Sequence, residues 1–442
     1  MNEIFVIGGG PGGVKLAQEL RAIGFEGKIV LIEENLLGGE CTNVGCIPSK
    51  TLYNFSKICY KIKKLTGKSF SFDTKLIVNT IRRVINMIRK GIELNLKNAE
   101  VEVINARAVI QGDKIFFNSS SYNFDCVAIC TGSIPVTLGY KHDRILTNRE
   151  LWGQMLEDFI NALSKGAKVL IVGGGYIGLE TACMFSNLFD GSQFIVVEKE
   201  KNILNTADDE IIQEIHKSIT KNSPNINILT NCSVKDIQYG PNSLIVEYDI
   251  SGEIFKDEFD FVLFSIGRKP NIPIQDLNKI EVNEFLEVKG MRNVWAIGDV
   301  IGGKLLAHKA EFQAKIASRN IIDKLQGKES RHRYTKTNEL QIPSVMFTIP
   351  EVGWYGLTEK ELKNMQVDFV SKKANIASNP RAIVDNSREG FVKILYNNRG
   401  EILGVHMIAE NVSEIISVPM VYNSETIVYP HPTISEIFGE LL

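Results

Sequence analysis

The sequence has no long apolar run, almost no net charge and no cysteine beyond position 232. Its longest hydrophobic stretches have the length of a β-strand, so no membrane-spanning helix is expected. Lysine and arginine number 50 against 52 aspartate and glutamate, which leaves a formal charge of −2 at pH 7. This balance gives no electrostatic case for binding nucleic acid or an anionic membrane surface.

Cysteine is sparse and odd in number. Seven cysteines in 442 residues do not make the dense, even framework of an extracellular disulfide-rich protein. Five of them lie in apolar or mixed surroundings and are interpreted as core residues: Cys59, Cys126, Cys130, Cys183 and Cys232. The chain enters a predicted strand almost at once, with no signal or transit segment before it. A reducing, cytoplasmic compartment is therefore expected.

The N-terminal segment has the pattern of a dinucleotide-binding βαβ unit. Strands are predicted at 4–7 and 28–32, with a glycine-rich turn and a helix between them. The signature residues are three glycines and a terminal acid: Gly8, Gly10, Gly13 and Glu33. The glycines permit a tight turn and close approach to a pyrophosphate, which rests on the helix N-terminus, while the acid accepts hydrogen bonds from ribose hydroxyls.

The same pattern occurs a second time. Strands are predicted at 168–172 and 194–197, and the signature residues are Gly173, Gly175, Gly178 and Glu198. In both copies the acid lies 20 residues after the third glycine (33 − 13 and 198 − 178). One glycine pattern alone is a weak signal and can be a structural turn, but two in full context at equal spacing indicate two nucleotide sites.

A close cysteine pair, Cys41 and Cys46, follows the first pattern. Such a pair can form and reopen a disulfide without large backbone movement, and a low-pKa thiolate beside a second thiol is typical of thiol–disulfide exchange. The alternatives are two structural cysteines or half of a metal site, but no second ligand pair lies nearby, so no metal is expected. The pair therefore predicts a redox enzyme whose thiols exchange electrons with a bound cofactor.

The position of the thiol pair indicates which nucleotide each site holds. Because Cys41 and Cys46 follow the first pattern, that site is expected to hold a flavin and the second a nicotinamide. Glu198 favours NAD, since an acid there binds a free 2′-hydroxyl and repels a 2′-phosphate. Lys199 and Lys201 lie close by and would soften that preference.

Further motifs give the chain a resemblance to the flavin-dependent pyridine nucleotide–disulfide oxidoreductases, over nearly its whole length. The motifs are the segments 38–50, 131–135, 267–271, 296–300, 343–353 and 431–436. Within that family the chain is most similar to the dihydrolipoamide dehydrogenases. Gly178 and Glu198 differ from the glutathione reductase pattern, and no cysteine pair of the mercuric reductase or large thioredoxin reductase kind stands at the C-terminus.

The resemblance implies an α/β fold with two Rossmann-like dinucleotide-binding domains, for FAD and NAD, plus an α+β C-terminal dimerisation domain. The expected divisions are 1–145 for the first part of the FAD-binding domain with the redox disulfide, 146–270 for the NAD-binding domain, 271–335 for a central segment completing the FAD site and 336–442 for the interface domain. The resemblance also implies a homodimer, in which each active site is completed by the partner's C-terminal domain.

The resemblance also assigns roles in catalysis. Cys46 is expected to be the flavin-proximal thiol, making a charge-transfer contact, and Cys41 the interchange thiol that meets the substrate. His431 is expected to be the acid–base, oriented by Glu436. A base near Cys41 is chemically required, because reducing or forming a disulfide moves protons at the thiols.

The cofactor contacts are implied in the same way. Lys50 and Glu180 match an ion pair beneath the flavin, Tyr176 matches an aromatic that gates the nicotinamide pocket, and Asp299 is expected to hold the ribityl chain. The expected FAD contacts are Gly8, Gly10, Gly13, Glu33, Lys50, Ala108, Gly132, Asp299 and Ala307. The expected NAD contacts are Gly173, Gly175, Tyr176, Gly178, Glu180, Glu198 and Gly267.

The function implied is the oxidation of dihydrolipoamide to lipoamide with reduction of NAD, on the free dithiol or on a lipoyl-bearing protein of a 2-oxo acid dehydrogenase complex. The alternatives are a related NAD(P)H-dependent disulfide, metal-ion or quinone reductase, similar to mercuric or glutathione reductase, and a non-catalytic flavoprotein. Two departures from the family pattern stand out. Glu40 precedes the first cysteine, and the segment 413–431, which contains Pro419, is short by about two helical turns.

Overall fold

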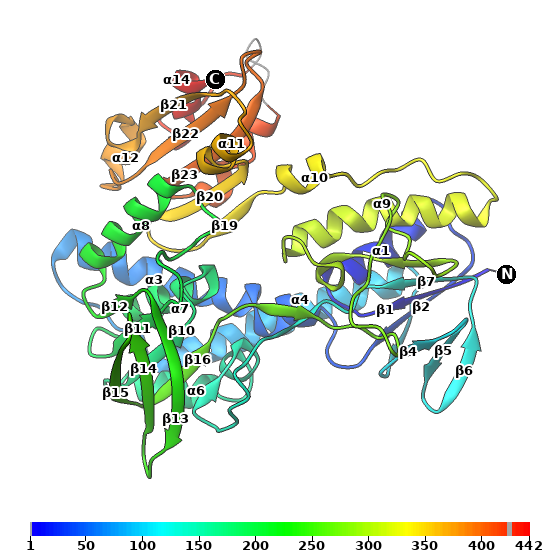
Figure 1. Cartoon of the computed structure of the whole chain (residues 1–442), viewed down its shortest axis with the longest axis horizontal. Coiled ribbons are helices and arrows are strands. Elements are labelled where there is room, and N and C mark those ends of the chain that lie inside the picture. Colours follow the sequence, from blue (N-terminus) through cyan, green and yellow to red (C-terminus); the bar gives the residue numbers. More distant parts are fainter. Residues whose placement is uncertain (1, 422–426) are drawn as a thin grey trace.

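The structure is a computed structural model that describes residues 2–421 and 427–442, and in it the chain forms three units (Figure 1). Each unit is built on a five-stranded sheet. The first unit lies near the N-terminus in Figure 1, the second contains β10, and the third carries the C-terminus. Within the described ranges, no helix combines the length and the apolar character needed to cross a membrane.

The first unit is a parallel sheet in the order β18-β7-β1-β2-β3. Its strands are β1 Glu3–Ile7, β2 Lys28–Glu33, β3 Glu102–Asn105, β7 Cys126–Ile129 and β18 Val294–Ala296. The central strands are buried along nearly their whole length, as expected for a parallel sheet covered on both faces. Strand β18 comes from far along the chain, so the backbone returns to this unit after building the second one.

Helices and a small antiparallel sheet complete the first unit. Helices α1 (Pro11–Ala22) and α9 (Ala307–Leu325) pack against each other beside the sheet (Figure 1). The antiparallel sheet consists of β4 Val109–Gln111, β5 Lys114–Phe117 and β6 Ser120–Asn123. A 3₁₀ turn, η1 (Gly298–Ile301), follows β18 and leads toward α9.

The second unit repeats the design with the strand order β12-β11-β10-β16-β9, again all parallel. Its strands are β9 Ile145–Leu146, β10 Lys168–Val172, β11 Gln193–Val197, β12 Ile226–Leu229 and β16 Phe261–Phe264. An antiparallel sheet is attached to it, formed by β13 Cys232–Tyr239, β14 Leu244–Ile250 and β15 Glu253–Phe259. Its helices are α5 Asn148–Trp152, α6 Leu156–Leu163, α7 Tyr176–Leu188 and α8 Asp209–Asn222.

Three helices and a two-stranded ribbon connect these units. Helices α2 (Gly39–Val44) and α3 (Cys46–Thr66) follow β2, and the long helix α4 (Thr74–Asn98) runs between the two units in Figure 1. Helix α3 packs on α4 and on α7 of the second unit. In the ribbon, β8 (Ser133–Pro135) pairs antiparallel with β17 (Arg268–Pro270), where the chain passes into and out of the second unit.

The third unit is an antiparallel sheet in the order β19-β20-β23-β22-β21. Its strands are β19 Ser344–Met346, β20 Glu351–Gly356, β21 Val370–Asn375, β22 Phe391–Tyr396 and β23 Ile402–Ala409. Short helices surround it: α10 Lys336–Gln341, α11 Glu359–Asn364, α12 Pro380–Val384, α13 Val412–Ile415 and α14 Phe438–Leu441, with the 3₁₀ turns η2 Ile376–Ser378, η3 Val418–Met420 and η4 Ile434–Ile437.

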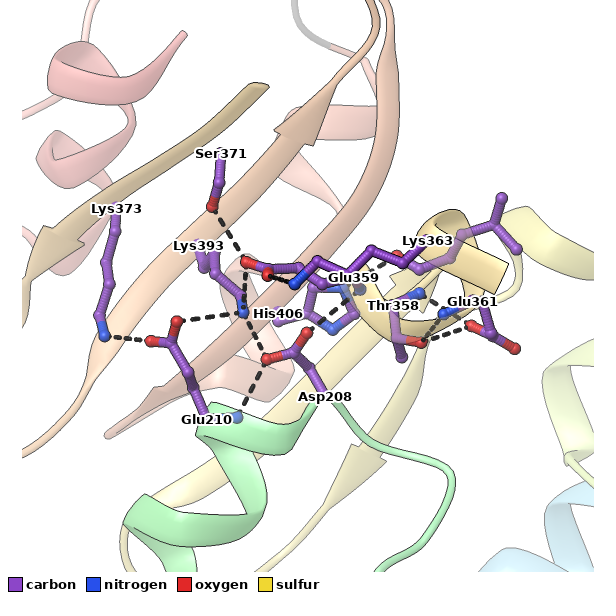
Figure 2. A network of polar contacts seen from close by, with 11 residues as sticks. Asp208, Glu210, Thr358, Glu359, Glu361, Lys363, Ser371, Lys373, Lys393 and His406 are labelled. Carbon is purple, nitrogen blue, oxygen red and sulfur yellow. Dashed lines mark hydrogen bonds and ion pairs between the residues drawn. The ribbon is translucent and has the colours of Figure 1, made fainter. Parts of the chain in front are cut away.

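A buried ion-pair network joins the second and third units (Figure 2). Lys393 on β22 is fully buried and pairs with Asp208, the N-cap of α8, and with Glu359 on α11 at 3.2 Å. On the neighbouring strand β23, His406 lies opposite Lys393, and its ring contacts the backbone oxygen of Leu357 at 3.1 Å. Charged side chains of the second and third units thus meet around one buried lysine.

The expected α/β fold with two Rossmann-like sheets and a C-terminal α+β unit is confirmed. Each of the four predicted strands lies within one residue of an observed strand, and 168–172 coincides with β10. In the segment 413–431, helix α13 ends at Ile415 and Pro419 stands in the 3₁₀ turn η3, because a proline in the interior of an α-helix would break it. Part of that segment lies outside the described residues.

Candidate functional site

The turn after β1 has the shape of a phosphate cradle. A Cβ at Gly8 would lie 2.4 Å from the backbone oxygen of Cys130, and one at Gly13 would lie 1.9 Å from that of Gly8, so both positions require glycine. By contrast, a Cβ at Gly10 would meet nothing closer than 3.9 Å. The middle glycine therefore faces open space at the N-terminus of α1, where a pyrophosphate would need the backbone to approach.

The turn after β10 repeats this geometry. A Cβ at Gly173 would lie 2.5 Å from the backbone oxygen of Ser265, and one at Gly178 would lie 2.1 Å from that of Gly173. A Cβ at Gly175 would meet no atom within 4 Å. The two turns thus share one tight pair of glycines and one open glycine, and both fit a dinucleotide.

The acids that end β2 and β11 occupy equivalent places. Glu33 accepts hydrogen bonds from the backbone N–H groups of Gly9 at 2.6 Å and Asn35 at 2.8 Å. Glu198 accepts them from Gly174 at 2.8 Å and Glu200 at 2.9 Å. Each carboxylate therefore uses two of its lone pairs to accept backbone N–H groups at and beside its glycine turn. Its remaining lone pairs stay available to a ribose.

A cavity of about 410 Å³ opens beside Glu33. It lies between the end of β2, strand β3 and helix α4, and its walls include Asn35, Leu37, Arg89 and Asn105. That volume is within the range of small-molecule sites. A nucleoside held by the first cradle has room here, so the residues of this unit fit FAD.

The two thiols lie on either side of Gly45, with Cys41 in α2 and Cys46 as the first residue of α3. Both are free thiols; Cys46 is exposed and Cys41 is half-buried. A hydrogen bond from the Cys41 thiol, helped by the charge of Lys50, lowers the pKa of Cys46 to about 7. The same hydrogen bond and burial raise the pKa of Cys41. Cys46 is thus the thiolate of the pair, favoured also by its place at a helix N-terminus.

A buried ion pair lies one helical turn beyond the thiolate. The Lys50 ammonium stands 2.8 Å from the Glu180 carboxylate, which is 7% exposed. Glu180 also accepts the backbone N–H of Phe347 at 2.8 Å, and Lys50 lies over the Phe347 ring at 4.4 Å. Helices α3 and α7 and the residue that follows strand β19 therefore converge on this pair, so all three units contribute to it.

The remaining expected cofactor contacts fall at chain turns and helix starts. Asp299 in η1 accepts a hydrogen bond from the Ser133 hydroxyl at 2.6 Å. Burial, followed by the charge of Glu180, raises the pKa of Tyr176 to about 12. Three further positions lie at a helix start or at a left-handed backbone conformation: Ala307 begins α9, and Gly132 and Gly267 have φ of +70° and +109°. Ala108 is buried directly before strand β4.

His431 and Glu436 form a pair on the surface of the third unit. The Glu436 carboxylate accepts a hydrogen bond from His431 Nδ1 at 2.9 Å and another from the backbone N–H of Thr433 at 2.8 Å. The Thr433 N–H, and then His431, lower the pKa of Glu436. The His431 side chain is 70% exposed, so it is accessible to a group outside this chain. Among the described residues, no hydrogen bond or ion pair links this pair to the thiols.

The structure adds a polar cluster around Glu40 that the sequence analysis did not identify. The Glu40 carboxylate pairs with Arg149 and Arg268 and accepts a hydrogen bond from the Asn148 amide at 3.3 Å. Its only sequence signals were the unusual glutamate before Cys41 and the motif that contains Arg268.

Within the described ranges, no group of three or more His, Cys, Asp or Glu residues is arranged to hold a metal ion.

Comparisons with known proteins agree with this geometry. The family model described as pyridine nucleotide-disulphide oxidoreductase matches residues 2–314, and the model of its dimerisation domain matches residues 342–442. A dihydrolipoyl dehydrogenase from Buchnera aphidicola (subspecies Schizaphis graminum) is 33% identical over 98% of this chain and 94% of its own. The Bacillus subtilis dihydrolipoyl dehydrogenase is 29% identical over 99% and 95%.

Solved structures show the same fold. LpdA from Mycobacterium tuberculosis has a TM-score of 0.85 at 21% identity, covering 100% of this chain and 98% of its own. The HOCl-induced flavoprotein disulfide reductase RclA from Escherichia coli has a TM-score of 0.80 at 23% identity, covering 99% and 98%. At these identities the likeness is one of fold.

Proposed function

This chain belongs to the pyridine nucleotide-disulphide oxidoreductase family, and from that premise we propose that it oxidises dihydrolipoamide to lipoamide and reduces NAD. Members of the family use FAD and NAD(H). The observation that carries the proposal is the thiol pair with unequal pKa values, placed between two dinucleotide cradles. The dihydrolipoyl dehydrogenases that match the full length favour this dithiol substrate.

In the proposed reaction the oxidised Cys41–Cys46 pair accepts two electrons from the substrate. A substrate thiolate attacks Cys41 Sγ, the Cys41–Cys46 bond breaks, and Cys46 leaves as a thiolate, which its pKa of about 7 favours. The second substrate thiolate then attacks the substrate sulfur held on Cys41, which closes the lipoamide disulfide and releases Cys41. FAD, held by the cradle of Gly8, Gly10 and Gly13, would supply the route by which the electron pair of the thiols reaches NAD, and loss of that pair would restore the Cys41–Cys46 disulfide.

Proton transfer in this reaction would involve His431, which is paired with Glu436. The substrate gives up two protons; one returns to Cys41, whose raised pKa favours the thiol, and the other goes to His431. Because His431 makes no bond to the thiols of its own chain, we assign this step to His431 of the partner subunit. The match to the dimerisation domain supports a homodimer.

The chain's own residues would hold both cofactors. The cradle glycines Gly8, Gly10 and Gly13 would take the FAD pyrophosphate and Glu33 its ribose, while Lys50 and Glu180 would lie at the junction with the thiols. The second cradle would take NAD, and the Glu198 carboxylate disfavours a 2′-phosphate. A lipoyl-bearing protein of a 2-oxo acid dehydrogenase complex is the proposed physiological partner.

The test is NAD reduction by the purified, FAD-loaded protein with dihydrolipoamide, run beside NADP and beside NADPH with glutathione disulfide. We expect turnover with dihydrolipoamide and NAD alone. A matched variant, His431→Gln, keeps the surface polar and should lower the dithiol reaction by about 10²–10⁴-fold while leaving flavin reduction by NADH intact. Turnover with NADPH and glutathione disulfide, and none with dihydrolipoamide, would overturn the proposal.

A further inference from the structure

Helix α2, which carries Cys41, has little stiffness of its own. It has six residues, Gly39–Val44, and is flanked by Gly38 with φ of +91° and by Gly45. An isolated helix of this length is unstable, because nucleation costs more than so few hydrogen bonds return. The position of Cys41 must therefore be set by side chains that tie α2 to its surroundings.

One tie runs back to the first cradle. The Asn43 amide donates to the backbone oxygens of Leu37 at 3.0 Å and Gly39 at 2.8 Å. At Gly39 itself a Cβ would lie 2.8 Å from Gly10 Cα, so the start of α2 rests directly on the glycine turn. This side of the helix is held within the first unit.

The other tie runs into the second unit, through Glu40. Its carboxylate pairs with Arg149 and Arg268 and accepts the Asn148 amide, which also donates to the Val44 backbone oxygen at 2.9 Å. Asn148 and Arg149 belong to α5, the first helix after the chain enters the second unit. Arg268 belongs to β17, by which the chain leaves it.

The Glu40 contacts also continue to the expected flavin side. Arg268 is 12% exposed and donates to the Ser133 hydroxyl at 2.8 Å and to the Ser133 backbone oxygen at 2.9 Å. Ser133 in turn donates to Asp299. An arginine fork can make all these bonds at once, whereas a lysine cannot. Without Glu40, two neighbouring arginines would face each other with no anion between them.

From these contacts we propose that Glu40 is a positioning residue for Cys41. Its carboxylate fixes α2 against both crossings of the chain between the first and second units, so the interchange thiol keeps its place relative to Cys46 and to the nicotinamide side. The inference rests on the proposed function, because it takes Cys41 as the thiol that meets the substrate.

The test uses the reduced, FAD-loaded protein and two readouts. The first is the ratio of Cys41 to Cys46 labelling by iodoacetamide across pH 5–9, resolved by mass spectrometry. The second is kcat and KM with dihydrolipoamide beside the rate of flavin reduction by NADH. In Glu40→Ala we expect the labelling ratio and kcat each to change by about tenfold, since sub-ångström to 1 Å misplacement of a reacting group costs up to about 10²-fold. Flavin reduction by NADH should stay within about twofold.

The matched control is Glu157→Ala. Glu157 on α6 pairs with Arg82 on α4 at 3.2 Å, so it also links the second unit to the helices of the first, away from the thiols. Glu40→Gln keeps the size and one acceptor and should fall between wild type and Glu40→Ala. If Glu40→Ala does not fold, Arg149→Ala removes one partner from the half-exposed side of the cluster and gives the same readouts.

Either readout decides the inference. A labelling ratio for Glu40→Ala within about twofold of that for Glu157→Ala would overturn it, and so would a kcat within that range. The labelling arm needs no substrate, so it still reports on Glu40 if the wild-type protein fails to oxidise dihydrolipoamide. Failure of the proposed function and failure of the positioning role are therefore distinguishable.

Discussion

Replacing Lys393 by methionine should weaken the interaction between the second and third units. The Lys393 side chain is 1% exposed and pairs with Asp208, which is 2% exposed, while Glu359 and Glu210 lie 3.2 and 3.5 Å from its ammonium (Figure 2). Methionine fills similar space but leaves Asp208 buried without its cation. Breaking a buried pair in this way costs about 3–5 kcal/mol.

The structure places the expected cost near the lower end of that range. Asp208 keeps the backbone N–H groups of Glu210 at 3.1 Å and Glu359 at 3.3 Å, which partly compensate its charge. We therefore expect Lys393→Met to lower the free energy of unfolding of this part of the molecule by about 3 kcal/mol. Lys393→Met combined with Asp208→Asn should cost less than Lys393→Met alone, because no buried anion is then left unpaired.

The pH dependence has a definite sign. Burial alone would raise the pKa of Asp208, but the hydrogen bond and the charge of Lys393, together with the other contacts of this carboxylate, outweigh burial and lower that pKa. A carboxyl with a depressed folded-state pKa stabilises the fold above its ordinary pKa of 3.8 and loses that contribution as the pH falls. The gap between wild type and Lys393→Met should therefore narrow below about pH 4.

The assay is urea unfolding followed by circular dichroism and tryptophan fluorescence at pH 7 and at about pH 3, within the range where the gap should narrow. Lys221→Met is the matched control: Lys221 on α8 pairs with Glu389 of the third unit at 2.6 Å, but it is 66% exposed. An exposed pair contributes about 0–1 kcal/mol. A cost for Lys393→Met no larger than that for Lys221→Met would refute the reasoning.

Three further outcomes follow from single side chains. Burial lowers the pKa of His406, so this side chain is protonated more readily in the unfolded chain than in the folded one, and stability should fall as the pH drops below about 6.5. His406→Gln should remove this pH dependence of the unfolding midpoint from pH 5 to 8, whereas the exposed control His216→Gln should keep it. Cys41→Ala removes the hydrogen bond that most lowers the pKa of Cys46, so the Cys46 pKa should rise from about 7 and alkylation of Cys46 at pH 7 should fall by about tenfold or more. An unchanged pH profile of Cys46 alkylation, measured by mass spectrometry, would contradict this. Glu198→Gln keeps the acceptor but removes the charge, so the ratio of kcat/KM for NAD over NADP should narrow by about tenfold, and an unaltered ratio would show that the charge does not select the cofactor.

The two nucleotide cradles could be predicted because the residues that define their sequence pattern are close together in the chain. Strand, glycine turn, helix, strand and acid follow one another within a few tens of residues, and the tight contacts at Gly13 and Gly178 are with the turns they belong to. Even the thiolate assignment has a local signal. Cys46 begins α3, and Lys50 stands one helical turn later on the same helix.

The polar clusters could not be predicted, because their members are distant in sequence and carry no periodic pattern. Glu40 and Arg268 are 228 residues apart, and Lys393 and Asp208 are 185 apart. A buried lysine on a strand such as β22 even contradicts the usual pattern, since a charge rarely lies inside unless it is paired. Only the folded chain shows that Asp208 caps α8 and meets Lys393 there.

The pairing of Lys50 with Glu180 explains why one site needs all three units. Lys50 is four residues into α3, counted from Cys46, and Glu180 is four residues into α7, counted from Tyr176, so the first turns of these two helices meet at this pair. Glu180 is nearly enclosed, and a lone carboxylate there would be costly. The ammonium of Lys50 and the backbone N–H of Phe347 compensate it, and the latter comes from the third unit. Any movement of the third unit away from α7 would leave Glu180 with one partner fewer. The C-terminal unit therefore contacts the Lys50–Glu180 pair within its own chain.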